Sequence, residues 1–370
     1  MKIYCAIPSQ FSLRQRNELR DRIPFISEHI NMVKVNTSEN KIVLEYEGTE
    51  EESTVLKSEM NTLIEHIAAT RWIEKPAVKK YETKHHHSLP IKQEQQHPHP
   101  KKTSAYYNEV ELALLEKLDA EMLAIAKQVK AQMRSYPTIL HEQNMQRNQY
   151  HKNFPQHIYA VHHIPHQHKI IEQFRKSNEG QDQWFTHTGD YLQPCICYHC
   201  YEELGNQKWD NHHIFTAKGP CFRHEVEWKL NTFRKNEFMM REIVFVGDQQ
   251  WVIFMREQLM QAVWTLFCKL DMTGHIIAAH DPFFHYDDVQ QKAMFQLVTD
   301  AKYELEVNVG DDKHYSIASF NYCEDVLCEK YNITGRDGQA LYSGCVAFGL
   351  DRWLAALFYY YGQDMKKLPL

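Results

Sequence analysis

The 370-residue sequence predicts an α+β protein with a small N-terminal unit and a larger C-terminal one. Short, strand-like apolar runs occur in both parts, and segments with apolar residues at steps of three and four lie between them. A stretch poor in apolar residues, from about residue 79 to residue 104, separates the two parts. Because 43% of the residues are hydrophobic and 12% are aromatic, the chain can bury a sizeable core.

Residues 1–78 are expected to form a small α+β domain. Ser53 is a candidate N-cap for a helix that continues to about Ile73, and no function is indicated for this unit. The other elements expected here are a strand at 3–7, a helix at 12–22 and strands at 32–35 and 41–46.

Residues 79–104 read as a flexible linker. The run His85-His86-His87 and the polar residues after it leave too few apolar side chains for a core. A solvated tether explains the histidine run better than a metal site does.

The larger domain, residues 105–370, is expected to begin with a helix over residues 108–133. Strands and helices alternate from about residue 158 onward. The apolar runs expected to form elements are 251–254, 275–279, 303–309 and 344–348, with helices at 261–270 and 289–298.

Composition excludes several classes of protein. The net charge of −6 argues against broad non-specific binding of nucleic acid, which needs an excess of Lys and Arg. Nine cysteines, an odd number in a long chain, do not indicate a disulfide framework. The sequence has no run of about 18 apolar residues and no signal-peptide core at its start, so a reducing cytoplasm and no membrane contact are expected.

Two arginines in apolar frames are the strongest functional signal. Arg223 lies in Gly219-Pro-Cys-Phe-Arg-His-Glu225, and Arg352 ends Gly344-Cys-Val-Ala-Phe-Gly-Leu-Asp-Arg352, 129 positions later (352 − 223). Because a guanidinium does not deprotonate, two of them can hold a triphosphate from opposite sides while charge moves in a transition state.

These segments resemble motifs 2 and 3 of class II aminoacyl-tRNA synthetases. The resemblance is closest to the amino acid:[carrier protein] ligases, which are similar to the catalytic core of atypical, zinc-dependent seryl-tRNA synthetases without their tRNA-binding part. Asp281-Pro-Phe-Phe284 and Ile317-Ala-Ser-Phe-Asn-Tyr322 support that branch, and the resemblance spans roughly residues 106–362. It implies an antiparallel sheet flanked by helices and a homodimer.

The resemblance also implies how ATP is bound. Arg223 would bind the α-phosphate and Arg352 the γ-phosphate, and these two are the expected catalytic residues. Phe238 would stack on adenine. Glu225 would accept a hydrogen bond from the adenine amino group or orient Arg223, and Asn321 falls at an ATP or magnesium contact.

A zinc ion is implied as well, held by Cys197, Glu242 and Cys345. Three protein ligands leave a fourth position open, which takes the α-amino group of the substrate in the family. One rival site is a structural zinc on Cys195, Cys197 and Cys200; if Cys195 and Cys197 lie on one strand, their side chains share a face. The histidines of the segment 162–168 are expected to be structural or solvated.

The sequence departs from the family in two places. Cys323 follows Phe-Asn-Tyr where the family tends to have His, and Met239 stands where it often has Arg. Residues 272–303 match a helical insertion that contacts the carrier protein in the family. This stretch combines Lys292 and Lys302 with several aspartates, so it offers no obvious basic face for an acidic carrier.

The implied function is ATP-dependent activation of a small amino acid, glycine or alanine, to an aminoacyl adenylate. The aminoacyl group would then pass to the phosphopantetheine thiol of an acyl or peptidyl carrier protein, with Zn²⁺ and Mg²⁺ as cofactors and no tRNA. One alternative is an aminoacyl-tRNA ligase of the atypical seryl type, although residues 1–78 show no basic, aromatic-rich RNA surface. The other is a non-catalytic synthetase-like subunit, against which the retained arginines and zinc ligands argue.

Overall fold

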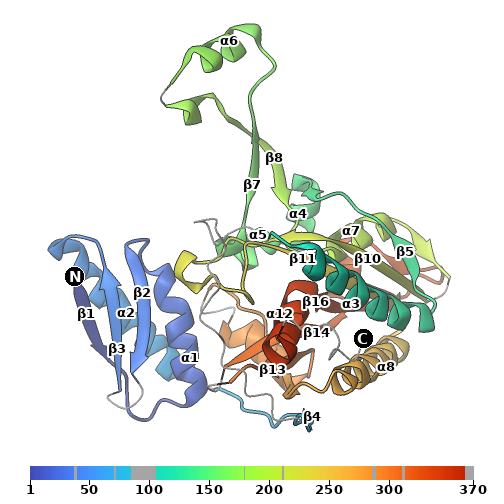
Figure 1. Ribbon diagram of the computed structural model, residues 1–370. Helices are drawn as coiled ribbons and strands as arrows, with labels where there is room; N and C mark the ends of the chain where they lie inside the picture. The colour runs from blue at the N-terminus through green and yellow to red at the C-terminus, as the bar shows by residue number, and fades with distance from the viewer. Residues whose placement is uncertain are drawn as a thin grey trace.

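A mainly antiparallel sheet forms the centre of the larger unit in the computed structural model, which describes residues 1–36, 40–70, 72–84, 106–178, 180–210, 212–285, 289–310 and 313–362 (Figure 1). Neighbouring strands run antiparallel except β5, which is parallel to β10. Within the described residues the strand order is β4 (Lys79–Tyr81), β12 (Gly274–Ala278), β13 (Lys302–Asn308), β14 (His314–Glu324), β16 (Tyr342–Gly349), β11 (Glu237–Gly247), β10 (His213–Phe222) and β5 (Gln132–Arg134).

The two faces of the sheet serve different purposes. Along β11, Ile243 and Phe245 face a large core with α3 (Glu109–Gln128), α8 (Gln249–Lys269) and α12 (Leu350–Tyr361). The alternate residues of the strand, Glu242 and Val244, face the opposite side, where α7 (Cys197–Leu204) packs. The helices α3, α8 and α12 lie together in Figure 1, where they cover one face of the sheet.

A buried ion pair joins α3 to the sheet. The Arg241 guanidinium donates two hydrogen bonds to the Asp119 carboxylate, at 2.6 and 3.0 Å, and one to the Thr216 hydroxyl at 3.1 Å. Both charged residues are more than 90% buried. Each charge therefore needs the other, since an unpaired charge in this core would be costly.

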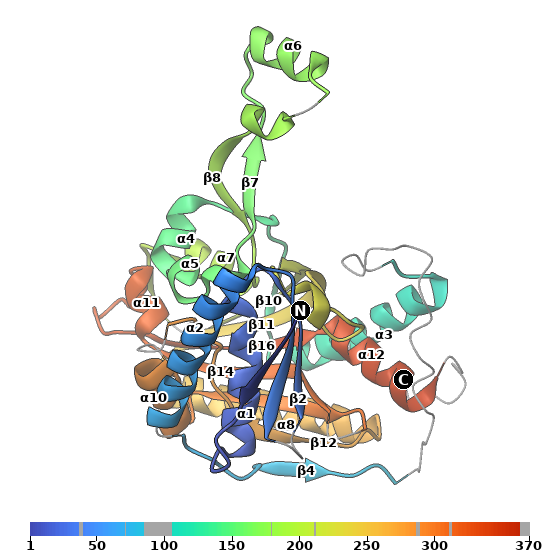
Figure 2. The same cartoon turned by 90° about the vertical axis from the view of Figure 1, so that its left-hand side faces the viewer.

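The N-terminal unit has a sheet of order β1-β3-β2 covered by α1 and α2, and it packs against the larger unit (Figure 2). The Arg22 guanidinium donates to the carbonyls of Phe283 and Phe284, both at 2.7 Å, and Lys229 pairs with Asp21 at 3.1 Å. The elements of the unit are β1 (Lys2–Ala6), α1 (Leu13–Arg22), η1 (Ile23–Phe25), β2 (Ile30–Asn36), β3 (Lys41–Tyr46) and α2 (Glu50–Ala69).

A long hairpin arm projects from the larger unit in both views (Figures 1 and 2). It consists of β7 (Ala160–His163), α6 (His168–Lys176), η3 (Gln181–Trp184) and β8 (Thr186–Leu192). At its base, the N–H groups of Phe222 and His224 donate to the carbonyls of Gln193 and His157. The arm therefore starts directly beside Arg223.

The remaining elements are short. They are β6 (Ile139–Leu140), α4 (Glu142–Asn148), α5 (Tyr150–Asn153), η2 (Pro155–His157), β9 (Lys208–Trp209), η4 (Glu227–Lys229), the π-helical η5 (Val289–Ala293), α10 (Met294–Val298), α11 (Val326–Lys330) and β15 (Thr334–Gly335). Among the described helices, none is both long enough and apolar enough to cross a membrane.

Two helix boundaries differ from the sequence prediction. Thr49, not Ser53, caps α2, because its hydroxyl and the Glu52 carboxylate form a capping box; the helix ends at Ala69. The helix expected over 108–133 stops at Gln128, since Lys130 adopts a left-handed conformation with φ of 58°. The chain then turns into β5.

Three other segments also differ. Residues 79–81, expected in the linker, form edge strand β4, and residues 85–105 lie outside the described residues. The apolar run 251–254, expected as a separate short element, is the first turn of α8, which Asp248 caps through the Trp251 N–H. Among the described residues of the segment 272–303, those at 289–298 are helical, and the first part contributes β12 to the sheet.

The Asp119–Arg241 pair predicts a large difference between two carboxylates on α3. Asp119→Ala should lower the free energy of unfolding by about 3–5 kcal/mol, because it leaves Arg241 buried and unpaired. Glu121→Ala removes an exposed pair with Lys269 and should cost at most about 1 kcal/mol. Calorimetric unfolding of both variants checks this, and equal effects would contradict it.

Candidate active site

Arg223 and Phe238 lie side by side at one end of the β10–β11 pair. Arg223 follows the last residue of β10, and its Nε–H donates to the Pro194 carbonyl at 3.2 Å. Its guanidinium lies 5.3 Å from the centre of the Phe238 ring. A cation over an aromatic face suits both the phosphate and the base of a nucleotide.

Arg352 enters the same region from the start of α12, at the strand-to-helix junction that the sequence predicts. Its guanidinium donates to the carbonyls of Phe233 at 2.8 Å and Ser316 at 2.7 Å. Burial, followed by the positive charges of Arg234 and Arg223, lowers the pKa of Arg352 to about 10. Arg223 and Arg234 are therefore close enough to Arg352 to repel it, and a bound polyanion would relieve that repulsion.

Glu225 is the acidic counterpart of this cluster. Its carboxylate pairs with Arg234 at 2.8 Å, and only 11% of its side chain is exposed. Burial opposes ionisation, but Arg234 and His157 hold the pKa of Glu225 below its usual value. Arg234 is not among the residues expected from the sequence, although its position between the two motif 2 strands is a signal for it.

A second overlooked group ties the loop between β10 and β11 to α12. The Asp351 carboxylate accepts hydrogen bonds from Tyr107, from Lys235 at 3.0 Å and from the Met239 N–H at 2.6 Å. Asp351 directly precedes Arg352. The same contacts therefore fix the loop that carries Arg234 relative to Arg352.

The candidate metal ligands gather on the α7 face. The sulfurs of Cys195 and Cys197 are 3.5 Å apart, and they and a Glu242 oxygen lie within 4.8 Å of one another. The Glu242 carboxylate accepts hydrogen bonds from the N–H groups of Ile196 at 3.2 Å and Cys197 at 2.8 Å. Burial and then the Cys345 sulfur raise the pKa of Glu242 to about 7, against the effect of those N–H groups.

Cys345 joins this cluster through Cys197. Its sulfur accepts hydrogen bonds from the Cys197 and Cys323 thiols and from the Asn321 amide, 3.3 Å away, and these hold the pKa of Cys345 well below the usual value. A thiolate beside further thiols and a carboxylate is a donor set that fits zinc. The structure thus adds Cys195 and Cys323 to the neighbourhood of the three expected ligands.

Asn321 faces this cluster through its side-chain amide, which also donates to Ser319 at 3.2 Å. Its expected contact with ATP or magnesium stays a prediction.

The Cys195–Cys197 pair does not lie on one strand, because Cys197 begins α7. Cys200 is outside the group formed by Cys195, Cys197 and Glu242, and its thiol is hydrogen-bonded with Tyr136. The histidines of residues 162–168 lie on the exposed arm.

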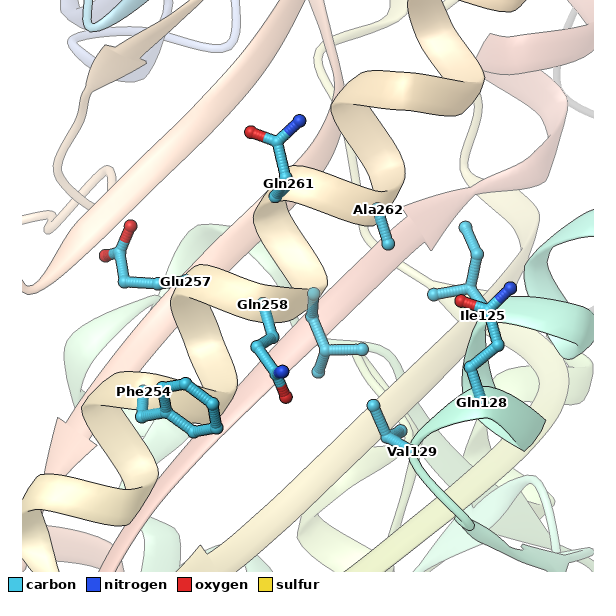
Figure 3. Close-up of a pocket in the computed structure, with 9 residues that line it drawn as sticks. Ile125, Gln128, Val129, Phe254, Glu257, Gln258, Gln261 and Ala262 are labelled. Carbon is cyan, nitrogen blue, oxygen red and sulfur yellow. The ribbon is translucent and has the colours of Figure 1, made fainter.

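A cavity of about 530 Å³ lies away from these residues, between α3 and α8. Figure 3 shows Phe254 and Gln258 of α8 lining it with Val129, the residue after the end of α3. It holds neither an arginine nor a metal-binding group of the site, so its position does not fit nucleotide chemistry.

The curated proteins similar to this chain include two kinds. Amino acid–[acyl-carrier-protein] ligases 2 and 1 of Bradyrhizobium diazoefficiens are 26% identical over 263 and 274 residues, covering 68% and 70% of this chain and 76% and 79% of those proteins. The type-2 serine–tRNA ligase of Methanopyrus kandleri is 23% identical over 192 residues, 49% of this chain and 36% of that protein. No family model matches the sequence.

Among solved structures, M. kandleri SerRS in complex with A. aeolicus tRNASec matches with a TM-score of 0.69 and 17% identity, covering 100% of this chain and 76% of that one. This chain is a class II synthetase-like protein, related to the amino acid–[acyl-carrier-protein] ligases. A cytoplasmic serine–tRNA ligase from Naegleria fowleri in complex with AMP has a TM-score of 0.57 at 12% identity, and covers 84% of this chain and 68% of that one. At these identities the structures establish the synthetase-like fold alone.

His157, beside Arg223 at the base of the arm, predicts a pH effect on stability. Burial and then Arg223 lower its pKa to about 4, from an ordinary value of 6.5. Between these two pKa values the folded state binds fewer protons than the unfolded state. The contribution of His157 to stability is therefore complete above pH 6.5, and it is lost as the pH falls through 4. His157→Gln should remove about 3 kcal/mol of this dependence. Unfolding midpoints at pH 7 and pH 4.5 measure it, and parallel losses in both proteins would contradict it.

Proposed function

We propose that the chain activates an amino acid with ATP and transfers it to an acyl-carrier protein. The observation that carries the proposal is the cluster of Arg223, Arg234 and Arg352, with Arg223 over the Phe238 ring, next to a thiol–carboxylate cluster. The first group suits a nucleoside triphosphate and the second an amine-binding metal. The two relatives named as amino acid–[acyl-carrier-protein] ligases support the same reaction.

In the activation step, a carboxylate oxygen of the amino acid attacks the α-phosphorus of ATP. The bond between the α-phosphorus and the bridging oxygen breaks, and pyrophosphate leaves. Mg²⁺, when bound, would offset the charge of the phosphates. Arg223 holds the α-phosphate, where charge builds up in the transition state, and Arg352 holds the γ-phosphate. Phe238 stacks on the adenine, and Glu225 accepts from its amino group or keeps Arg234 and Arg223 in place.

Cys197, Glu242 and Cys345 would hold the zinc ion. When bound, zinc supplies a Lewis-acidic position that takes the neutral α-amino group of the substrate. The chain's own contribution is orientation: the Asn321 amide donates to the Cys345 sulfur, and the first N–H groups of α7 hold Glu242. We infer a small substrate, glycine or alanine, from the resemblance.

The second step passes the aminoacyl group from the adenylate to the phosphopantetheine thiol of the carrier, and AMP leaves. Docking at residues 272–303 and assembly as a homodimer are further parts of the proposal. A cytoplasmic location is supported by nine free thiols. Transfer to tRNA is less favoured, because residues 1–78 carry 10 Lys and Arg against 12 Asp and Glu, a net charge of −2 (10 − 12).

The arginines are tested by ATP–pyrophosphate exchange with each of the twenty amino acids. Arg223→Lys and Arg352→Lys should each lower exchange by about 10²–10³-fold, because lysine cannot reproduce the guanidinium contacts. Arg336→Lys, an exposed residue paired with Asp210, is the control and should exchange like the wild type. Absence of exchange with every amino acid in the folded, zinc-loaded wild type would refute the proposed activation.

Metal removal tests the ligand set. Chelation should abolish amino-acid-dependent exchange, and added zinc should restore it. Cys345→Ser should bind zinc more weakly at the cysteine cluster and lose exchange. Cys200→Ser, which alters a buried thiol hydrogen-bonded with Tyr136, should keep both zinc binding and exchange. The opposite pattern would favour the structural site on Cys195, Cys197 and Cys200.

A further inference from the structure

Three neighbouring strands bring two imidazoles and a carboxylate together at the far end of the central sheet. The ligand atoms of His275, Glu306 and His314 all lie within 4.8 Å of one another. His275 Nε2 is 3.2 Å from a Glu306 oxygen, and the two histidine rings are 5.1 Å apart, centre to centre. None of these residues belongs to the cysteine cluster described above.

The strand register explains why these side chains converge. His275 on β12 is directly opposite Glu306 on β13, and His314 on β14 is opposite Asn308, two residues further along β13. Since side chains of one strand alternate between faces, all three lie on the face opposite Leu305 and Val307, which belong to the core. The backbone ladders of β12, β13 and β14 hold the positions in place before any ligand arrives.

We propose that His275, Glu306 and His314 form a second metal site, which binds Zn²⁺ or a similar divalent transition-metal ion. Two imidazoles and one carboxylate are typical ligands of such ions, and they leave further positions to water. The side chains of His275 and Glu306 are 21% and 27% exposed, and His314 is exposed, so an ion can enter from solvent. An ordinary ion pair accounts for His275 and Glu306 but not for the second imidazole.

The position of the site suggests its role. The two residues after His314 support Arg352: Tyr315 stacks on Phe233 at 4.3 Å, and the carbonyls of Phe233 and Ser316 accept from the Arg352 guanidinium. A metal ion at His314 would link this segment to β12 and β13. Bound metal should therefore stabilise the fold and steady Arg352.

Cobalt titration of the metal-stripped full-length chain tests the proposal, because Co²⁺ bound by thiolates and Co²⁺ bound by imidazoles have different absorption spectra. The wild type should show two classes of bound Co²⁺, one with intense thiolate-to-metal absorption and one with only weak visible bands. His275→Ala and His314→Ala should each weaken the second class by at least ~10-fold and leave the first unchanged. Glu306→Gln, which keeps the side-chain shape, should do the same.

His212→Ala is the matched control. His212 pairs with Asp248 at 2.6 Å, but it belongs to no three-residue metal group among the described residues. This variant should keep both classes. Zn²⁺ should also raise the unfolding midpoint of His212→Ala more than that of His314→Ala, and equal midpoints without metal show that both variants fold. If the second class is absent from the wild type, or persists unchanged in His275→Ala and His314→Ala because other histidines bind it, the proposal is wrong.

Discussion

The carboxylate of Glu242, buried in the middle of the central sheet, connects the structural core to the site. It accepts hydrogen bonds from the N–H groups of Ile196 and Cys197 at the start of α7, where the helix dipole also favours a negative charge. A buried carboxylate without such partners would be strongly destabilising. This bond positions α7, and with it Cys197, against β11. The neighbouring strand β16 then places Cys345 beside Cys197.

The arginine cluster shows the opposite balance of charge. Arg223 and Arg234 both lie close to Arg352, and Glu225 is the acidic residue paired with Arg234. Burial, and then repulsion from Arg234 and Arg223, lower the pKa of Arg352. This repulsion is an energetic cost that the fold carries without a ligand. Backbone carbonyls and the Asp351 contacts hold the groups in place despite it. A polyphosphate would enter a site whose donors are already aimed, which is the condition under which electrostatic stabilisation is most effective.

The sequence predicts this frame well where local pattern and tertiary structure agree. Both motif 2 strands and the junction at Gly349 carry distinctive residues, and the structure confirms the strands and the helix that follow from them. It predicts less well where long-range pairing decides. The chain beyond Lys130 and the edge strand β4 become strands because β10 and β12 offer partners distant in the sequence. The prediction of a separate short element at residues 251–254 is wrong for a different reason. Asp248 caps α8 through the Trp251 N–H, so the apolar run becomes part of that helix.

The same limit applies to the site. Arg223, Glu225, Phe238 and Arg352 fall in recognisable local motifs, whereas the proximity of Arg234, Asp351 and Cys323 to them depends on side-chain directions that spacing does not fix.

The distance in sequence between the proposed metal ligands has a consequence for biogenesis. Cys197 and Cys345 are 148 residues apart (345 − 197), on a helix and a strand that meet only when β16 pairs with β11. Unlike a zinc finger, whose ligands are close in sequence, this chain cannot use a metal ion at Cys197 and Cys345 to nucleate its folding. Zinc binding at these proposed ligands would therefore follow the folding of the metal-free protein, as a separate event in its maturation.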